Sequence, residues 1–162
     1  MSVRIITTGG TFDKKYNELD GSLVFDGTHL PEMLSIAKNE LGIKIEDLMA
    51  IDSLDMEEDH REKILKKCRS CKEDKIIITH GTDTMVETAK LLGEHVNDKV
   101  IVLTGAMVPY SFGKGDALFN LGCAFGLIQT LDKGVYITMN GKLFRWDGVR
   151  KNRELGKFEK IK

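Results

Sequence analysis

Short apolar runs alternate along the chain with longer segments in which apolar residues recur every three or four positions. The runs predict five strands, over residues 3–7, 43–51, 76–79, 99–104 and 135–139. The helical spacing between them predicts four helices, over residues 31–41, 57–71, 85–96 and 115–131. Strands that alternate with helices indicate parallel βαβ units. We therefore expect one α/β domain over residues 1–162, with a doubly wound, mainly parallel sheet in a three-layer α/β/α arrangement.

The apolar stripes of the helices predict which residues face the sheet. In the first helix the predicted stripe consists of Met33, Ala37 and Leu41. In the last helix it consists of Leu118, Leu121, Phe125 and Ile128. By contrast, residues 140–162 are basic and mixed and show no clear periodicity, so no element is predicted there.

A polar segment follows the first strand. Asp20-Gly21 is a turn signal and Leu23 begins a possible short strand, so residues 13–28 are expected to form a hairpin. Because this hairpin comes directly after a glycine-rich turn, we expect it to act as a flap that carries Tyr16.

Composition and charge narrow the class of protein. The 24 basic and 25 acidic residues give a net charge of -1, so bulk charge indicates neither a nucleic-acid nor a membrane partner. The apolar runs are far shorter than the roughly 20 residues that cross a bilayer, and residues 1–6 lead directly into a strand pattern without a leader. Three cysteines, Cys68, Cys71 and Cys123, make no disulfide framework, so we expect a cytoplasmic protein. The C-x-x-C spacing of the first two is expected to be structural.

Hydroxyl groups and glycines follow four of the predicted strands. Because the carboxyl ends of parallel strands meet at one edge of a sheet, which we call the crest, these residues are expected to converge. They are Thr11, Ser53, Thr82, Asp83 and Ala106. The Gly9-Gly10 turn could hold an anion or an oxyanion, but neither the dinucleotide nor the P-loop glycine pattern is present, so nucleotide binding is not expected.

Four motifs occur along the chain: TGGT at residues 8–11, THGTDTM at 79–85, TGAM at 104–107 and GDALFNL at 115–121. Together, in their order and spacing, these motifs resemble those of the bacterial-type L-asparaginase family. The resemblance is to the N-terminal domain of enzymes about twice as long, and implies a short form in which the second domain is absent. It implies hydrolysis of the side-chain amide of L-asparagine, with no metal or organic cofactor.

The resemblance also implies roles for individual residues. Thr11 matches the family's nucleophile, whose attack on the amide carbon releases ammonia and leaves an acyl-enzyme that water converts to aspartate. A threonine hydroxyl is too weakly acidic to attack unaided, so it needs a relay. Tyr16 matches the tyrosine of the family's flap, and Thr82, Asp83 and Lys151 match its second catalytic group.

The second group leaves one question of proton transfer open. Desolvation would favour a neutral, basic Lys151, whereas a neighbouring carboxylate such as that of Asp83 favours the ammonium. The residues that the resemblance implies in substrate binding are Gly10, Ser53, Gly81, Thr82, Asp83 and Ala106. Among these, the N–H groups of Gly10 and Thr82 are the expected oxyanion donors.

The chain also departs from the longer family members. Leu54 stands where they have a substrate-binding glutamine, and Tyr16 follows Thr11 more closely than their flap tyrosine does. Their second domain lends groups to a neighbouring subunit's site, and its expected absence suggests a homo-oligomer. Two alternatives stay open: the amide-releasing subunit of a tRNA-dependent amidotransferase, or a non-catalytic amino-acid-binding module. His80 is expected to be a packing residue rather than a ligand.

Overall fold

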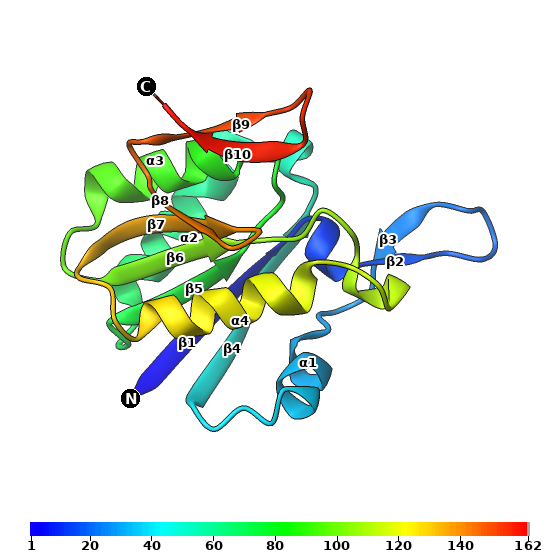
Figure 1. The fold of residues 1–162 in the computed structure, drawn as a ribbon, viewed down its shortest axis with the longest axis horizontal. Coiled ribbons are helices and arrows are strands. Elements are labelled where there is room, and N and C mark those ends of the chain that lie inside the picture. The colour runs from blue at the N-terminus through cyan, green and yellow to red at the C-terminus, as the bar shows by residue number, and fades with distance from the viewer. Residues whose placement is uncertain (162) are drawn as a thin grey trace.

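One sheet of six strands forms the centre of the protein in a computed structural model that describes residues 1–161 (Figure 1). The strands are ordered β4-β1-β5-β6-β7-β8 across the sheet. Their bounds are Ser2–Gly9 (β1), Gly42–Ile51 (β4), Lys75–Thr79 (β5), Val100–Thr104 (β6), Gly134–Met139 (β7) and Lys142–Arg145 (β8). The first five strands in this order are parallel, and β8 is antiparallel to β7. The mainly parallel sheet confirms the predicted fold class.

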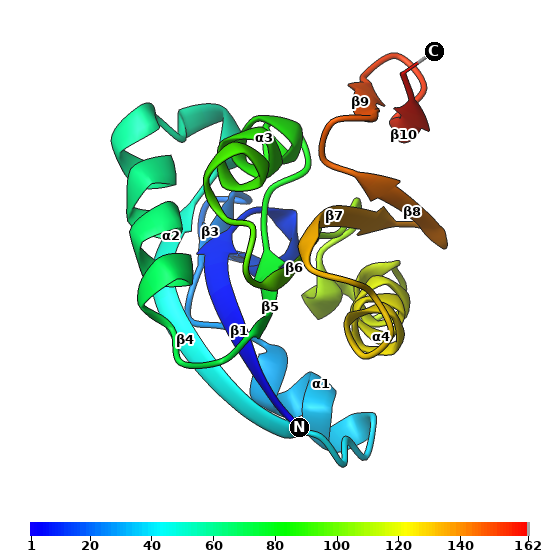
Figure 2. The same cartoon turned by 90° about the vertical axis from the view of Figure 1, so that its left-hand side faces the viewer.

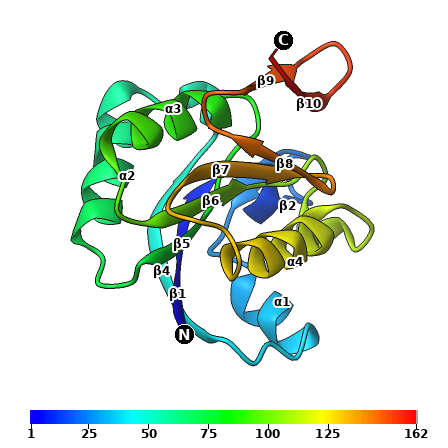
Figure 3. The same cartoon turned by 60° about the vertical axis from the view of Figure 1, so that its left-hand side comes forward.

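Four helices cover the two faces of the sheet (Figures 2 and 3). On one face lie α1 (Leu30–Ile36) and α4 (Ala117–Ile128), and on the other lie α2 (Glu58–Ser70) and α3 (Met85–His95). Ile76 and Ile78 of β5 belong to the apolar cluster beneath α2 and α3, whereas Ile77 belongs to the cluster beneath α1 and α4. All three are fully buried, which explains the continuous apolar run and confirms the three-layer arrangement.

The order of the strands reverses beside β1. The chain passes from β1 through α1 to β4 on one side, and then through α2 to β5 on the other side of β1. The segments after β1 and β5 therefore lead to helices on opposite faces, α1 and α3, and separate at the crest. Such a topological switch point is where open α/β sheets bind ligands.

The first helix is shorter than its stripe predicts. The N–H of Lys38 donates to the carbonyl of Ser35 (3.1 Å) and the N–H of Asn39 to that of Leu34 (3.0 Å), while Lys38 has a φ of 49°. This Schellman pattern ends α1 at Ile36, so the prediction of a helix to residue 41 is wrong.

The buried face of α4 also differs from the predicted stripe. The residues that face the sheet include Ala117, Leu121, Ala124 and Ile128. Leu118 is 37% exposed, so the prediction that it lines the core is wrong, whereas Phe125 is partly buried and packs against the core as predicted. Small residues at 117 and 124 let the helix approach the sheet closely, and a periodicity counted on large apolar residues overlooks them.

The tail is regular, although its pattern predicts no element. Asn140 and Gly141 have φ values of 50° and 81° and join β7 to β8, which is an Asn-Gly hairpin signal that the search for periodicity overlooks. A second hairpin follows, formed by β9 (Val149–Asn152) and β10 (Lys157–Lys160).

Short elements complete the fold. A two-stranded hairpin of β2 (Lys14–Tyr16) and β3 (Leu23–Phe25) projects from the body of the protein (Figure 1). Three 3-10 turns lie near the crest: η1 (Thr11–Asp13), η2 (Ser53–Asp55) and η3 (Tyr110–Phe112). Within residues 1–161, no helix has both the length and the apolar content needed to cross a membrane.

Candidate active site

Gly10 and Gly81 bring the segments after β1 and β5 into backbone contact. A Cβ added to Gly10 would lie 2.4 Å from the Cα of Gly81, and Gly10 has a φ of 77°. A side chain at residue 10 would therefore clash with backbone and strain its own conformation, so glycine is required. The contact places Thr11 and Thr82, the next residue of each segment, together at the switch point.

Ser53 joins this contact from the segment after β4. A Cβ added to Gly81 would lie 2.5 Å from the Cβ of Ser53, which is 1% exposed. The hydroxyl of Thr84 donates to the carbonyl of Ser53 (2.7 Å), and the side chain of Asp52 accepts the N–H of Leu54 (3.1 Å). Ser53 is thus held on two sides, next to the threonines predicted to share its site.

Lys151 reaches the same place from the second half of the chain. Its Nζ donates to Oγ1 of Thr82 (2.8 Å) and to Oδ1 of Asp83 (2.6 Å). The Lys151 side chain is only 9% exposed, whereas that of Asp83 is 34% exposed. A buried ammonium is thereby paired with a carboxylate and with a hydroxyl whose own hydrogen is free to point elsewhere.

Packing of the tail against α3 determines where Lys151 lies. A Cβ added to Gly93 of α3 would lie 2.3 Å from the indole of Trp146, so the ring rests directly on the helix backbone. Val149 and Phe158, one on each strand of the second hairpin, are buried in the cluster beneath α2 and α3. Lys151 pairs with Phe158 in the register of that hairpin. The apolar anchors therefore bring β9 beside the start of α3, where Thr82 and Asp83 are.

The GDALFNL motif has a structural role beside Ala106. The carboxylate of Asp116 accepts the N–H groups of Met107 (3.0 Å) and Val108 (3.1 Å). Asn120 donates its side-chain N–H to the carbonyl of Gly105 (2.9 Å). The start of α4 thereby fixes the segment after β6, in which Ala106 is 1% exposed at the crest.

His80 is a fully buried residue beneath the site. Burial lowers the pKa of its imidazole to about 4, so the ring is neutral near pH 7. The carbonyl of Gly81 lies 2.8 Å from Nδ1 and can only accept, so Nδ1 carries the proton. Nε2 then accepts the hydroxyl of Thr88 (2.7 Å). These contacts agree with the packing role predicted for His80.

One predicted oxyanion donor is engaged elsewhere. The N–H of Gly10 donates to the carbonyl of Ile51 (3.0 Å), within the connection between β1 and β4. The prediction that it serves the oxyanion is therefore wrong for this conformation. Among the described residues, no hydrogen bond engages the N–H of Thr11 or that of Thr82, so both are available as donors at the switch point.

Tyr16 lies apart from the residues gathered at the crest. It is 55% exposed on β2, and its hydroxyl lies near Gly21, 3.6 Å from where a Cβ of that glycine would be. Figure 1 shows the β2–β3 hairpin, which ends its first strand at Tyr16, projecting from the body of the protein. The tyrosine that the resemblance assigns to the flap is therefore solvent-exposed on this hairpin.

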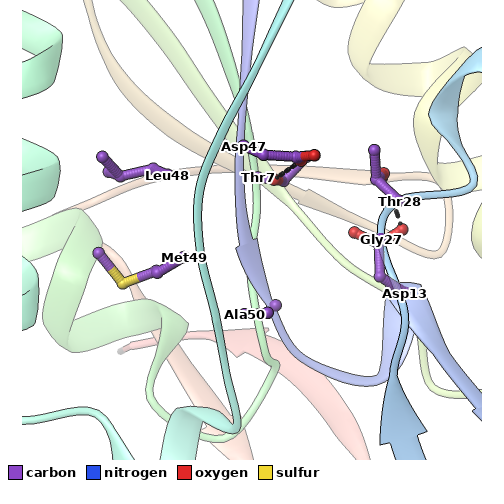
Figure 4. Close-up of a pocket in the computed structure, with 9 residues that line it drawn as sticks. Thr7, Asp13, Gly27, Thr28, Asp47, Leu48, Met49 and Ala50 are labelled. Carbon is purple, nitrogen blue, oxygen red and sulfur yellow. Dashed lines mark hydrogen bonds between the residues drawn. The ribbon is translucent and has the colours of Figure 1, made fainter.

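A cavity of about 240 Å³ lies beside the crest, between β1, β4 and the segment that precedes α1 (Figure 4). The side chains of Asp13 and Thr28 point into it, and Asp47 and Thr7 face them from the strands (Figure 4). Burial raises the pKa of the Asp13 carboxyl. Thr11, Thr82 and Lys151 do not line this cavity, so the candidate site is defined by its converging polar groups and not by the cavity.

Two basic residues near the site have no signal in the sequence. Lys14 forms an ion pair with Asp52, and Nη2 of Arg153 donates to the carbonyl of Asp83 (3.3 Å). Neither belongs to a motif, and each reaches its partner across a loop, so only the tertiary structure reveals them.

The fold and the site define a doubly wound α/β protein, with two threonines, a carboxylate and a buried ammonium gathered at a topological switch point. A family model described as "Asparaginase, N-terminal" matches residues 2–158. The chain therefore belongs to the asparaginase family, which confirms the resemblance predicted from its motifs.

Individual relatives agree with this assignment. The probable periplasmic L-asparaginase of Haemophilus influenzae is 35% identical over 160 residues, which are 88% of this chain and 44% of that protein. The thermostable L-asparaginase of Thermococcus kodakarensis superposes with a TM-score of 0.88 at 26% identity, covering 99% of this chain and 51% of that one. A glutamyl-tRNA(Gln) amidotransferase subunit of Methanococcus vannielii is 31% identical over 88% of this chain and 35% of its own. The chain thus spans about half the length of these relatives, or less.

Proposed function

We propose that this protein hydrolyses the side-chain amide of L-asparagine to L-aspartate and ammonia. The observation that carries the proposal is the contact of Lys151 with both Thr82 and Asp83, beside Thr11 at the switch point. A merely structural tail would have no need to bury an ammonium against a hydroxyl and a carboxylate.

Thr11 is the nucleophile in the proposed reaction. Its Oγ1 forms a bond to the amide carbon, and the oxyanion that results accepts the free N–H groups of Thr11 and Thr82. The hydroxyl proton passes to the amide nitrogen as the C–N bond breaks, so ammonia leaves and an acyl-enzyme remains. Tyr16 assists the proton transfer when its hairpin closes over the site.

Thr82, Asp83 and Lys151 act on the second half of the reaction. Water attacks the ester carbon, its proton passes through the Thr82 hydroxyl, and the Thr11 oxygen leaves with a proton. Lys151 donates to the Thr82 oxygen and so orients that hydroxyl toward the water. The carboxylate of Asp83 balances the ammonium and binds the α-ammonium of the substrate.

The other contacts of the substrate follow from the same geometry. The Ser53 hydroxyl binds the α-carboxylate, and the short side chain of Ala106 leaves room for the amide group. Gly10 and Gly81 contribute by letting the segments that carry Thr11, Thr82 and Ser53 meet in backbone contact. Leu54, which is 63% exposed, adds no polar contact.

Ammonia release from L-asparagine by the purified protein tests the proposal. We expect Thr11→Ala to abolish release and Thr11→Ser to retain part of it, because serine keeps a nucleophilic hydroxyl. Release by Thr11→Ala at the wild-type rate would overturn the nucleophile assignment. Binding of L-aspartate without any turnover by the wild-type protein would support an amino-acid-binding module instead.

A second candidate function rests on the relative from Methanococcus vannielii, which is named as an amidotransferase subunit. In that case the chain would release ammonia from an amide for use by a partner protein. Glutamine hydrolysis that appears only with a second protein subunit and charged tRNA would favour this function over free asparaginase activity.

Assembly and location complete the proposal. Several large apolar side chains are exposed at the crest end of the molecule: Leu54, Met107, Phe112, Leu118 and Phe119. We propose that a second copy covers them in a homo-oligomer, and a monomer mass by light scattering at working concentration would contradict this. The free thiols of Cys68, Cys71 and Cys123 suit a reducing compartment, so we place the protein in the cytoplasm.

A further inference from the structure

Lys14 connects the projecting hairpin to the body of the protein. Its ammonium forms an ion pair with the carboxylate of Asp52 and lies 5.6 Å from the ring centroid of Phe25, its partner in the hairpin register. Its carbonyl accepts the hydroxyl of Ser111 (2.8 Å). The Lys14 side chain is 16% exposed, so this ammonium is largely removed from water.

Asp52 lies at the start of the turn that presents Ser53. One of its carboxylate oxygens accepts the N–H of Leu54 (3.1 Å), and the other pairs with Lys14. Ser53 itself is held from the opposite side by Thr84 and by the contact with Gly81. If Lys14 moves, Asp52 loses its ion pair and the start of the Ser53 turn loses a support. The hydrogen bond from Thr84 to the carbonyl of Ser53 does not replace that support.

We infer that Lys14 is a positioning residue, whose ion pair with Asp52 couples the hairpin that carries Tyr16 to the turn that carries Ser53. The inference rests on the proposed function, in which Ser53 binds the substrate α-carboxylate and Tyr16 must move inward. A carboxylate bound at Ser53 fixes the Ser53 turn and with it Asp52, which in turn holds Lys14. Tyr16 is two residues beyond Lys14 on the same strand, so this ion pair favours the closed hairpin when substrate is bound. Breaking the pair therefore weakens substrate binding and, because the hairpin closes less in the bound state, also lowers kcat.

The neighbouring lysine provides a matched control. Lys15 forms an ion pair with Asp26, so it too joins a lysine of β2 to an aspartate. This pair lies within the hairpin segment and its side chains are 42% and 67% exposed. Among the described residues, neither side chain has an ion pair or hydrogen bond to the Ser53 turn. Lys15→Met removes the same charge from the same strand without breaking the connection to the body.

Steady-state ammonia release separates the two lysines. We expect Lys14→Met and Asp52→Asn each to raise KM for L-asparagine about tenfold and also to lower kcat, because Tyr16 acts in the closed hairpin, and Lys15→Met to leave both KM and kcat unchanged. The amide oxygen introduced by Asp52→Asn can still accept the N–H of Leu54, so this variant removes the ion pair with Lys14 and keeps the other contact of residue 52. If the residues act as a pair, the double variant raises KM no further than either single variant. Lys14→Arg, which keeps a cation, restores KM and rules out a general loss of folding.

A second readout follows the hairpin directly and needs no turnover. Glu18 lies in the exposed loop between β2 and β3, so cleavage after Glu18 by a glutamate-specific protease, located by mass spectrometry, reports whether the hairpin is open. We expect saturating L-aspartate to slow this cleavage about threefold or more in wild type and in Lys15→Met, but not in Lys14→Met.

The outcomes distinguish this inference from the proposed function. Equal KM values in Lys14→Met and wild type, or equal protection by aspartate, overturn the coupling while wild-type turnover still supports an asparaginase. Absence of protection in the wild-type protein also overturns the coupling. Protection that depends on Lys14 in a protein that releases no ammonia supports the coupling and contradicts the hydrolysis.

Discussion

Replacement of Lys151 by methionine removes an ammonium and retains most of the apolar stem. Two charge-assisted hydrogen bonds are lost, each worth about 1.5–3 kcal/mol in net terms when buried. Asp83 is 34% exposed, so water replaces much of what its carboxylate loses, and we expect unfolding stability to fall by only about 1–2 kcal/mol. For a chain of this length that corresponds to a decrease in Tm of roughly 2–8 °C.

Catalysis is expected to suffer much more than folding. Loss of a residue that positions a proton relay costs about 10²- to 10⁴-fold in kcat, or roughly 3–5 kcal/mol of transition-state stabilisation. The assay compares kcat for L-asparagine with Tm measured by differential scanning fluorimetry. Arg150→Met is the control, because Arg150 precedes Lys151 on β9, is exposed and, within residues 1–161, pairs only with Glu159 across the hairpin.

The two effects distinguish a catalytic from a structural lysine. A Lys151→Met protein that keeps more than half of its kcat would refute the assigned role. So would a variant whose activity loss is fully explained by the fraction unfolded at the assay temperature. Arg150→Met with the same loss of kcat would show that the effect comes from the hairpin rather than from the ammonium.

Three further predictions follow from burial and backbone contact. Gly10→Ala should destabilise the fold by several kcal/mol, because the new Cβ would clash with the backbone of Gly81. Gly122→Ala in α4 should stabilise the fold by about 1 kcal/mol, because its Cβ would meet open space. Urea unfolding measures both changes. The pKa of the His80 imidazole in the folded protein lies below its value of 6.5 in the unfolded chain. The free energy of unfolding should therefore fall by about 3 kcal/mol in all as the pH is lowered from 6.5 to about 4, because the unfolded chain binds a proton that the folded protein does not. His80→Gln should lack that slope in unfolding measurements between those pH values. Gly93→Ala should displace Trp146 and lower kcat at least tenfold; unchanged kcat would contradict the anchoring of Lys151.

Local patterns predict much of this fold correctly. Strands at residues 76–79 and 99–104 and the helix after residue 84 follow directly from apolar periodicity, because each is long enough to repeat its pattern. The end of α1 depends instead on the left-handed conformation of Lys38, which no periodicity encodes. The buried face of α4 depends on alanines, whose small size matters only against a neighbouring sheet.

The site divides in the same way. Parallel strands that share a carboxyl edge are sufficient to predict that the segments bearing Thr11, Ser53 and Thr82 meet, because the direction of each strand is implied by the βαβ order. By composition, Lys151 is an ordinary lysine of a basic tail, and only the resemblance to the family singles it out.

What the residues alone establish is therefore the family, the parallel sheet and the hydroxyl groups at its crest, since all of these depend on local periodicity and on motifs short enough to read directly. The contact of Lys151 with Thr82, the ion pair of Lys14 with Asp52 and the engagement of the Gly10 N–H belong to the tertiary structure. They join segments up to 69 residues apart. Such contacts depend on how whole elements pack against one another, and the local sequence around a residue does not identify a partner that is distant along the chain.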